Sequence, residues 1–292
     1  MVVTNLIGGL GNQMFQYAAG RALSLQYKTP LRLDISGFAN YGLHQGFELH
    51  RVFNCSAEVA SKTDVRRTLG WQSLPFVRRV LLRPSMAAFR HENYIIEPHF
   101  YYWPSFHQLT KDSYLQGYWQ SEKYFTDVAT QIREDFTFKL PMKNKDAELV
   151  LDMNQLNSVS LHVRRGDYAS NPEATSVHGL CSIEYYQMAI KYISERVHLP
   201  NLYIFSDDIA WVKNNLKIDF PHHYINHNHG AESFNDMRLM SLCKHHIIAN
   251  SSFSWWGAWL NASVDKIVVA PHRWFAIDAD ESDLIPSGWT RL

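Results

Sequence analysis

The chain has 292 residues, enough for one large domain or two of ordinary size. Apolar residues make up 46% of it and the formal net charge is zero, which excludes a disordered chain and a general nucleic-acid-binding surface. Three widely separated cysteines exclude a disulfide framework and favour a reducing compartment. We expect a soluble chain, because it shows neither a secretory signal pattern nor a run of roughly 18 apolar residues.

The first expected elements are a strand over residues 2–7, a glycine turn, a helix from near Asn12, and a second strand over residues 31–34. This β-α-β unit resembles the dinucleotide-binding fingerprint, with Asp34 near the usual position of the ribose-binding acid. However, Met14 occupies the place of the third glycine, which argues against a nicotinamide or flavin site. We expect the glycines to let the backbone pass close to another ligand or to a facing domain.

Residues 38–110 are irregular and aromatic, with a helix expected over residues 61–69. The aromatic residues that follow, including Tyr118 and Trp119, either stack on sugar rings or fill the core. Helices are expected over residues 121–136 and 145–155. The polar, proline-containing stretch between them, residues 139–145, is the best candidate for a linker.

The carboxyl-terminal half alternates strands and helices. Strands are expected over residues 158–163, 202–205, 223–225, 247–249 and 267–269, with helices after Ser182, over residues 231–243 and around Trp255. This alternation implies parallel strands covered by helices, so the fold class is α/β.

Three of these strands end in charged or hydroxyl-bearing turns: Arg164-Arg165-Gly166-Asp167, Ser206-Asp207-Asp208 and Asn250-Ser251-Ser252. Parallel strands end at one edge of a sheet, so the turns should converge there. Two guanidinium groups facing a helix start suit an anion such as phosphate. The structural alternatives are an Arg–Asp pair that closes a turn and helix capping by Ser251, Ser252 or Asp208.

No metal is expected. The adjacent histidines, such as His222-His223, would point apart on a strand, and there is no HExxH or paired CxxC motif. Asp278-Ala279-Asp280 imitates the metal-binding triplet of many sugar transferases, but it lies in a Glu/Ser-rich loop near the terminus. The sequence also lacks the GxSxG motif of serine nucleophiles.

Three motifs resemble the hallmark motifs of bacterial α1,2-fucosyltransferases, glycosyltransferase family 11. They are residues 8–17 (GGLGNQMFQY), residues 162–168 (HVRRGDY) and residues 251–257 (SSFSWWG), in the order of the family and across nearly the whole chain. The second motif is also similar to one in α1,6- and protein O-fucosyltransferases.

This resemblance implies a GT-B-like fold of two Rossmann-type domains that face each other across a cleft. We place an acceptor-side domain in residues 1–144 and a GDP-fucose-binding domain in residues 145–292. The resemblance also implies inverting, metal-independent transfer of L-fucose from GDP-β-L-fucose to the 2-hydroxyl of a terminal β-galactoside, with no cofactor.

The resemblance also implies roles for individual residues. His162 and Asp236 would recognise guanine, and Arg164 would hold the β-phosphate together with Ser251 and Ser252. Asp207 or Asp208 would fix Arg165 or nearby groups, and Asn12 would lie near the reacting centre. The donor site is completed by Asp167 and Phe253.

A general base is left open among Asp34, Glu48, Asp167 and Glu173, and the relatives suggest a path that needs little base assistance. We select Asp34 because it ends a strand in the acceptor half, with a turn or cap residue as the alternative interpretation.

Two other functions are kept open: transfer from another nucleotide sugar, and sugar binding without turnover. We expect a bacterial cytoplasmic enzyme, with membrane association at the inner face through a lipid-linked acceptor such as O-antigen as a further expectation. The acceptor itself and the oligomeric state are not predicted.

Overall fold

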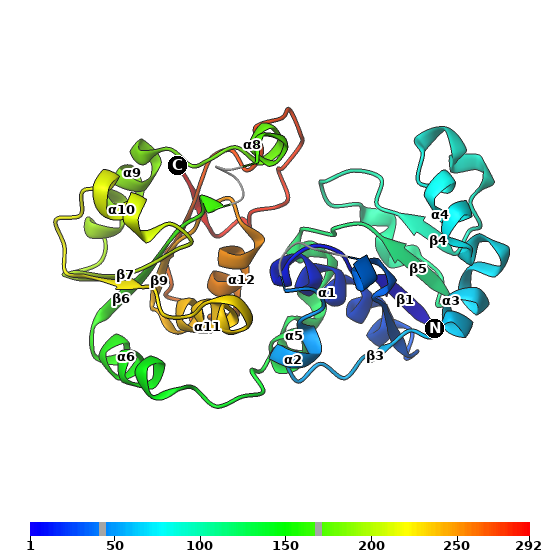
Figure 1. The fold of residues 1–292 in the computed structure, drawn as a ribbon, viewed down its shortest axis with the longest axis horizontal. Helices are drawn as coiled ribbons and strands as arrows, with labels where there is room; N and C mark the ends of the chain where they lie inside the picture. Colours follow the sequence, from blue (N-terminus) through cyan, green and yellow to red (C-terminus); the bar gives the residue numbers. More distant parts are fainter. Residues whose placement is uncertain (41–44, 167–170) are drawn as a thin grey trace. The chain divides into compact units, whose positions relative to one another are not determined.

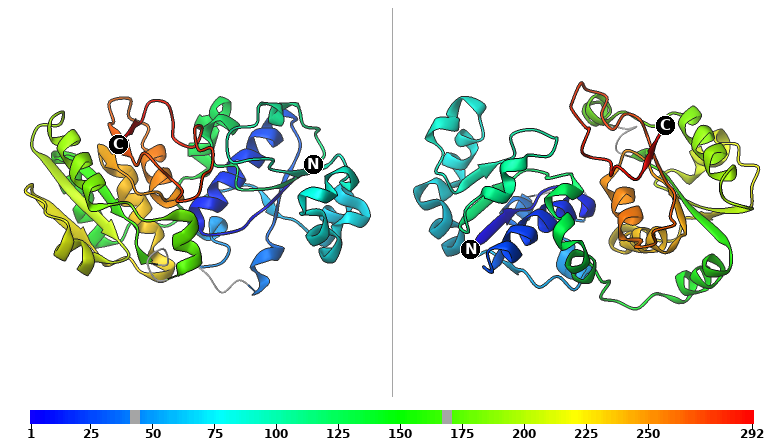
Figure 2. Two further views of the ribbon diagram at one scale, coloured as in Figure 1. Left: turned by 90° about the horizontal axis from the view of Figure 1, so that it is seen from above. Right: turned by 180° about the vertical axis from the view of Figure 1, so that it is seen from behind.

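The computed structural model describes residues 1–40, 45–166 and 171–292. The chain divides into two compact units (Figures 1 and 2). Unit 1 comprises Met1–Lys139 and Ser282–Leu284, and unit 2 comprises Leu140–Glu281 and Ile285–Leu292. Asp167, one of the predicted donor-site residues, lies outside the described residues.

Unit 1 is built on a five-stranded sheet in the order β3-β2-β1-β5-β4, with every neighbouring pair parallel. The strands are β1 (Val2–Asn5), β2 (Leu31–Asp34), β3 (Glu58–Val59), β4 (Tyr94–Ile96) and β5 (Ser113–Gln116). The α-helices are α1 (Leu10–Gln26), α2 (Leu49–Val52), α3 (Lys62–Leu69), α4 (Pro75–Leu81) and α5 (Ala129–Asp135). Short 3-10 helices lie at Ser36–Asn40, Gly70–Ser73, Pro84–Phe89, Pro104–Gln108, Glu122–Tyr124 and Thr126–Val128.

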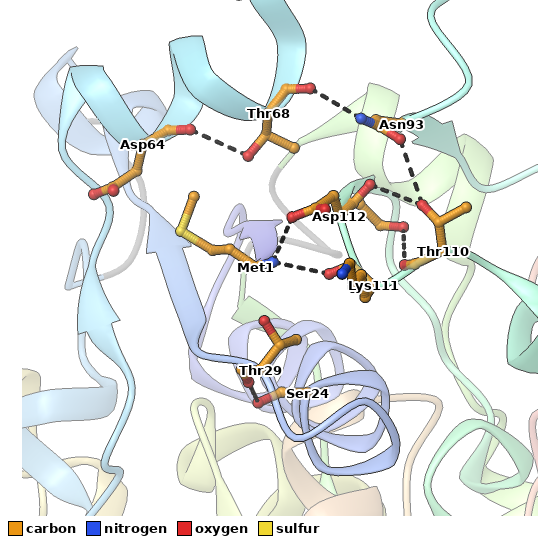
Figure 3. Close-up of polar contacts among 10 residues, drawn as sticks. Met1, Ser24, Thr29, Asp64, Thr68, Asn93, Thr110, Lys111 and Asp112 are labelled. Atoms are coloured by element: carbon orange, nitrogen blue, oxygen red, sulfur yellow. Dashed lines mark hydrogen bonds and ion pairs between the residues drawn. The ribbon is translucent and has the colours of Figure 1, made fainter.

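The start of β1 is tied to the segment that leads into β5, as Figure 3 shows. The Met1 ammonium donates to the Lys111 carbonyl at 2.9 Å and pairs with Asp112 at 2.6 Å. Asn93 connects the same region to α3 by donating to the Thr68 carbonyl at 3.5 Å. These contacts hold β1, β5 and the turn before β4 side by side.

The segment Ser282–Leu284 belongs to unit 1 although it comes late in the chain. The Asp283 carboxylate accepts a hydrogen bond from the Tyr102 amide at 3.1 Å and pairs with Lys123, and its carbonyl accepts from the Ser121 hydroxyl at 2.7 Å. Nothing in the local sequence pattern predicts this return.

Unit 2 is built on a six-stranded parallel sheet in the order β11-β10-β9-β6-β7-β8. The strands are β6 (Asn157–Val163), β7 (Pro200–Ser206), β8 (His222–Ile225), β9 (His245–Ile247), β10 (Val268–Ala270) and β11 (Thr290–Arg291). The helices are α6 (Asn144–Gln155), α8 (Pro172–His178), α9 (Ile183–Ser194), α10 (Ile209–Asn215), α11 (Phe234–Leu242) and α12 (Ser252–Leu260), with a 3-10 turn at Gly230–Glu232.

Two hydrophobic clusters cover the two faces of this sheet. One packs α9 and α10 against alternate β6 residues, including Val159, Leu161 and Val163. The other packs α6 and α11 against the opposite side of β7 and β8, for example at Tyr203 and Phe205. The expected α/β fold with parallel strands under helices is confirmed.

Local details also agree with or depart from the sequence predictions. Ser182 caps α9 as predicted, because its side chain accepts from the Tyr185 amide. The helix expected over residues 121–136 is wrong in its first half. There, Ser121 caps a 3-10 turn and Phe125 has a non-helical φ of −140°, so the α-helix begins only at Ala129.

Along residues 1–40, 45–166 and 171–292, no helix combines the length and the apolar character needed to cross a membrane.

Candidate functional site

The sheet of unit 2 has a topological switch point between β6 and β9. From β6 the chain winds outward to β7 and β8, whereas β9, β10 and β11 lie on the other side. Leu161 pairs with Ile247, and the same register continued puts Arg164 level with Asn250. Open α/β sheets bind ligands in the crevice at this position, so the Arg164 and Ser251 turns border the expected ligand site.

The Arg164 side chain is held by Asp207, which follows the neighbouring strand β7. Arg164 Nη1 lies 2.7 Å from Asp207 Oδ2, and the other oxygen, Oδ1, accepts a hydrogen bond from the Arg165 amide at 2.8 Å. One carboxylate therefore fixes both the guanidinium of Arg164 and the turn that carries it. The Arg164 side chain is about a quarter exposed, at 26%, so a ligand can still reach it.

The glycine of the Arg-Arg-Gly turn is required by this arrangement. A Cβ on Gly166 would lie 2.4 Å from Asp207 Oδ2, closer than real Cβ atoms approach other atoms. Any other residue would displace the carboxylate that holds Arg164.

Arg165 and Asp208 have different surroundings. The Arg165 guanidinium stacks on the Trp211 ring at 3.8 Å, and its Nε is 3.8 Å from Asp208 Oδ2, too far for a hydrogen bond. Asp208 instead caps α10 by accepting from the Trp211 amide at 2.9 Å. The capping alternative considered for Asp208 is therefore what the structure shows.

The third turn places two hydroxyl groups at the start of α12. Ser251 occupies the N-cap position, but its side chain accepts no capping hydrogen bond, so the structure does not support capping as its use. Ser252 begins the helix, and the first amide groups of a helix have no partners within the helix. The Ser251 amide already donates to the Ala249 carbonyl at 2.8 Å, so the Ser252 amide and the two serine hydroxyls are the donors that suit an anion at this helix start.

His162 lies on β6 two residues before Arg164, buried and close to Phe253 of α12, with ring centroids 6.1 Å apart. Burial, assisted by the nearby Arg164 charge, lowers the pKa of His162 to about 3, so the imidazole is neutral at physiological pH. Its Nδ1 atom is buried and has no hydrogen-bond partner. A neutral ring with an unused polar atom suits contact with an uncharged ligand group such as a base.

Asp236, in the first turn of α11, belongs to a polar cluster that the sequence did not predict. Asn228 donates to Asp236 at 2.9 Å and lies 3.4 Å from Asp146, which also accepts from His227 at 2.7 Å. Burial raises the pKa of Asp236 to about 7, the Asn228 hydrogen bond opposes this rise, and the Asp146 charge adds to it. The family resemblance had named Asp236, but no local pattern pointed to its partners Asn228, Asp146 and His227.

In unit 1, Asn12 lies on the first turn of α1, beside the glycine turn that follows β1. Gly8 has a left-handed φ of 79°, and a Cβ there would lie 2.7 Å from the Asn12 amide nitrogen. The Asn12 side-chain oxygen accepts from Gln120, which follows β5, at 2.8 Å. The lack of a side chain at Gly8 thus allows the side-chain amide of Asn12 to lie against the Gly8 backbone.

The geometry of Asp34 does not suit a general base. It is buried, its Oδ2 accepts from Tyr114 at 2.6 Å and pairs with Arg78 at 2.7 Å, and its Oδ1 accepts from the Ser36 amide. Burial alone would raise the pKa of Asp34, but these hydrogen bonds hold it below its usual value. This favours the alternative interpretation, a turn residue that also anchors α4.

The other base candidates differ. Glu48 is buried and pairs with Arg51 at 2.6 Å, and burial raises its pKa against the Arg51 charge. Asp167 and the Glu173 side chain lie outside what the structure describes. Among the described residues, no group of three or more His, Cys, Asp or Glu side chains is placed to hold a metal ion.

Comparison with known proteins shows the family. The sequence pattern of glycosyl transferase family 11 matches residues 71–291. The chain belongs to glycosyl transferase family 11. It is 40% identical to an alpha-1,2-colitosyltransferase of Escherichia coli, with 100% of this chain and 99% of the relative covered. It is 37% identical to the O-antigen biosynthesis glycosyltransferase WbnK of Escherichia coli, with 98% and 99% covered.

A solved structure supports the fold. The fucosyltransferase NodZ from Bradyrhizobium aligns with a TM-score of 0.52 and 13% identity, over 88% of this chain and 90% of NodZ. The expected GT-B-like fold class is confirmed, and the family assignment makes the protein a glycosyltransferase.

Proposed function

We propose that the protein transfers L-fucose from GDP-β-L-fucose to the 2-hydroxyl of a terminal β-galactoside, with inversion and without a required metal. The observation that carries the proposal is the arrangement at the switch point of unit 2. Arg164, oriented by Asp207, and the turn that carries the Ser252 amide and the Ser251 and Ser252 hydroxyls follow neighbouring strands. This combination suits a nucleoside diphosphate leaving group.

In the reaction, the bond between sugar C1 and the diphosphate oxygen breaks, and negative charge develops on the diphosphate. Arg164 and the donors at the start of α12 are positioned before the reaction and stabilise that charge without reorganising. Asp207 prevents the guanidinium from moving away. The fixed cation takes the part that a bound metal ion plays in other transferases.

Guanine is assigned to the side of the sheet that carries His162, Phe253 and Asp236. The Asp236 carboxylate accepts hydrogen bonds from the two adjacent N–H groups on the guanine edge, which adenine lacks. Neutral His162 contacts the base with its unused ring nitrogen, and Phe253 supplies an aromatic face.

A second donor is favoured by one observation, the 40% identity to an alpha-1,2-colitosyltransferase. Colitose is fucose without its 3-hydroxyl group. A site that hydrogen-bonds that hydroxyl would reject colitose strongly, whereas a site with no partner for it would accept both sugars.

The test is a donor comparison. Purified protein is titrated with GDP-fucose, GDP-colitose, GDP-mannose and a UDP-sugar in thermal-shift assays, since a bound ligand raises the melting temperature with concentration. Turnover with β-galactosides, with and without EDTA, is followed by linkage analysis of the product. The proposal requires GDP-fucose binding, an α1,2 product and no loss with EDTA. A preference for GDP-colitose would mean that colitose, and not fucose, is the transferred sugar. A preference for a UDP-sugar would refute the proposal.

A further inference from the structure

The helical segment that precedes β4 has an unusual composition. Residues 65–91 contain six arginines and no aspartate or glutamate, whereas the chain as a whole has equal numbers of basic and acidic residues. The segment comprises most of α3, the 3-10 turn at Gly70–Ser73, helix α4 and the 3-10 turn at Pro84–Phe89. Figures 1 and 2 show these elements, drawn in cyan, as one cluster at the side of unit 1 that carries the edge strand β4.

The inner side of α4 is packed into unit 1. Leu81 is buried with Tyr94 of β4 in a hydrophobic cluster that also includes residues of β1 and β5. Val77, four residues before Leu81 and therefore on the same side of the helix, packs against that cluster. Arg78 is also directed inward, because its Nη1 pairs with the buried Asp34 at 2.7 Å. The opposite side of α4 is left facing solvent.

This solvent-facing side of α4 presents an aromatic ring beside arginines. Phe76 is 78% exposed. Arg79, three residues later and therefore on the same side of the helix, is exposed, and Arg83 is exposed just after the helix ends. The segment contains no carboxylate that could neutralise either guanidinium group.

The two 3-10 turns add three more exposed apolar side chains. Trp71 is 65% exposed, Leu74 is 57% exposed and Phe89 is 64% exposed. The Leu74 amide donates to the Trp71 carbonyl at 3.4 Å, and side chains three residues apart in such a turn lie over one another. Single exposed apolar residues are common, but several close together mark an interaction surface. We call this set the arginine–aromatic surface: Trp71, Leu74, Phe76, Arg79, Arg83 and Phe89.

Polar side chains fix the parts of this surface to one another. The buried Gln72 side chain donates to the Phe89 carbonyl at 2.9 Å, which ties the second 3-10 turn to the first. Arg90 donates from Nε to the Leu81 carbonyl at 2.9 Å and from Nη2 to the Arg83 carbonyl at 3.2 Å. These bonds hold the second turn against the end of α4, so the exposed rings and guanidinium groups belong to one firm support.

An anionic lipid bilayer matches both kinds of side chain. Tryptophan and phenylalanine favour the boundary between headgroups and acyl chains, where an apolar layer lies beneath a polar one. Arginine can lay its aliphatic stem along the apolar layer while its guanidinium group reaches the lipid phosphates. The negative potential of such a membrane attracts basic residues that have no carboxylate partners of their own.

We propose that the arginine–aromatic surface binds membranes that contain anionic phospholipids. Trp71, Phe76 and Phe89 enter the boundary of the acyl chains, and Arg79 and Arg83 bind the lipid phosphates. The ligand is the bilayer itself, in contrast to association through a lipid-linked acceptor. The inference goes beyond the proposed function and does not depend on which sugar the enzyme transfers.

The test is flotation of the purified full-length protein with lipid vesicles. One set of vesicles is phosphatidylcholine alone, and the other is an equal mixture of phosphatidylcholine and phosphatidylglycerol. We expect the protein to float with the anionic vesicles and not with the neutral ones. Binding should weaken between about 0.05 M and about 0.5 M salt, because salt screens the attraction between exposed charges.

Two double variants test the two parts of the surface. Arg79→Glu with Arg83→Glu should lower the partition coefficient for anionic vesicles on the order of 10²-fold, because two attractive charges become repulsive. Trp71→Ser with Phe76→Ser should lower it on the order of 10–10²-fold, because the apolar area that enters the bilayer is lost.

Matched controls come from exposed residues of unit 2. Lys145→Glu with Lys191→Glu makes the same change in net charge, and both lysines are exposed. Leu151→Ser removes an apolar side chain that is 64% exposed, about as much as Trp71. Both controls should bind vesicles like the wild type.

Failure of the wild type to bind anionic vesicles would leave the surface to a protein partner and would overturn the inference. Equal binding to neutral vesicles, or double variants that bind like the wild type, would overturn it as well. Melting temperatures check that each variant is folded. If the serine variant does not fold, the glutamate variant decides, because Arg79 and Arg83 are exposed and lie outside the hydrophobic cluster.

Discussion

Arg164 and Asp207, which follow neighbouring strands of unit 2, form an ion pair of 2.7 Å that orients the guanidinium at the edge of the sheet. The pair is partly exposed, so its contribution to stability is small. Its proposed role is to orient the guanidinium, because an arginine that is fixed in advance stabilises a developing diphosphate charge better than a mobile one.

Arg164→Lys should lower kcat by on the order of 10²–10³-fold, because lysine keeps the charge but loses the two-pronged geometry. Arg164→Ala should lose as much or more. Circular dichroism and melting temperature serve as folding controls. Near-normal turnover by the lysine variant would contradict the role of Arg164.

Asp207→Asn and Asp208→Ala form a pair of substitutions at adjacent positions. Asp207→Asn should lower kcat by about 10²-fold, since Arg164 is no longer held in position. Asp208→Ala, which removes the cap of α10, should cost about 1 kcal/mol of stability with little effect on kcat. Steady-state kinetics and thermal melts separate the two outcomes. Equal losses of kcat in the two variants would contradict the role of Asp207 in orienting Arg164.

Donor binding should depend on pH through Asp236. Its pKa is about 7, and the proposed guanine recognition requires the ionised form, so we expect affinity to be lost as pH falls through 7. Below that pH the Kd of GDP-fucose should rise about tenfold per pH unit. Isothermal titration from pH 5 to 9 measures this, and GDP-fucose is the suitable probe because its diphosphate has no ionisation near neutral pH. Asp236→Asn should bind weakly at every pH.

The same residue should lower stability at neutral pH. Its pKa is raised in the folded state, so between about pH 4 and pH 7 the folded protein binds more protons than the unfolded one, and stability falls as pH rises. Asp236→Asn should therefore melt at a higher temperature than the wild type at pH 8 and gain less at pH 5. A lower melting temperature at pH 8 would show that the carboxylate is stabilising.

Asp34 should prove structural. Asp34→Asn leaves Arg78 without its buried partner and should cost on the order of 3 kcal/mol at pH 7. The pKa of Asp34 is lowered by folding, so its contribution is present at neutral pH and is lost as pH falls below about 4. Asp34→Asn should keep the same dependence of kcat on pH as the wild type, and loss of an acidic limb in this variant would restore Asp34 as the base.

The turns proposed to bind the donor could be located from the sequence because they follow strands closely. Strong alternation over residues 158–163 locates the end of β6, and Arg164 follows at once. Ser251 is found in the same way, although its position beside β6 needed the sheet order. Because β6 and β9 are adjacent in the observed sheet, the turns that follow them lie side by side.

The strand ends of unit 1 could not be predicted in the same way. β3 and β4 have two and three residues, too few to show a period, so neither strand was predicted from the sequence. Asp34 was selected because it ends a strand, but its carboxylate is occupied by Arg78 and Tyr114, which come 44 and 80 residues later. Whether a carboxylate is available for catalysis depends on such distant partners, and the local sequence pattern does not reveal them.

The central claim is that the diphosphate of the donor lies between Arg164 and the start of α12. A crystal structure of the protein with GDP measures this most directly. The account predicts the β-phosphate within hydrogen-bond distance of the Arg164 guanidinium and of the Ser252 amide or the Ser251 and Ser252 hydroxyls. A diphosphate bound elsewhere, or bridged to the protein by a coordinated cation, would contradict it.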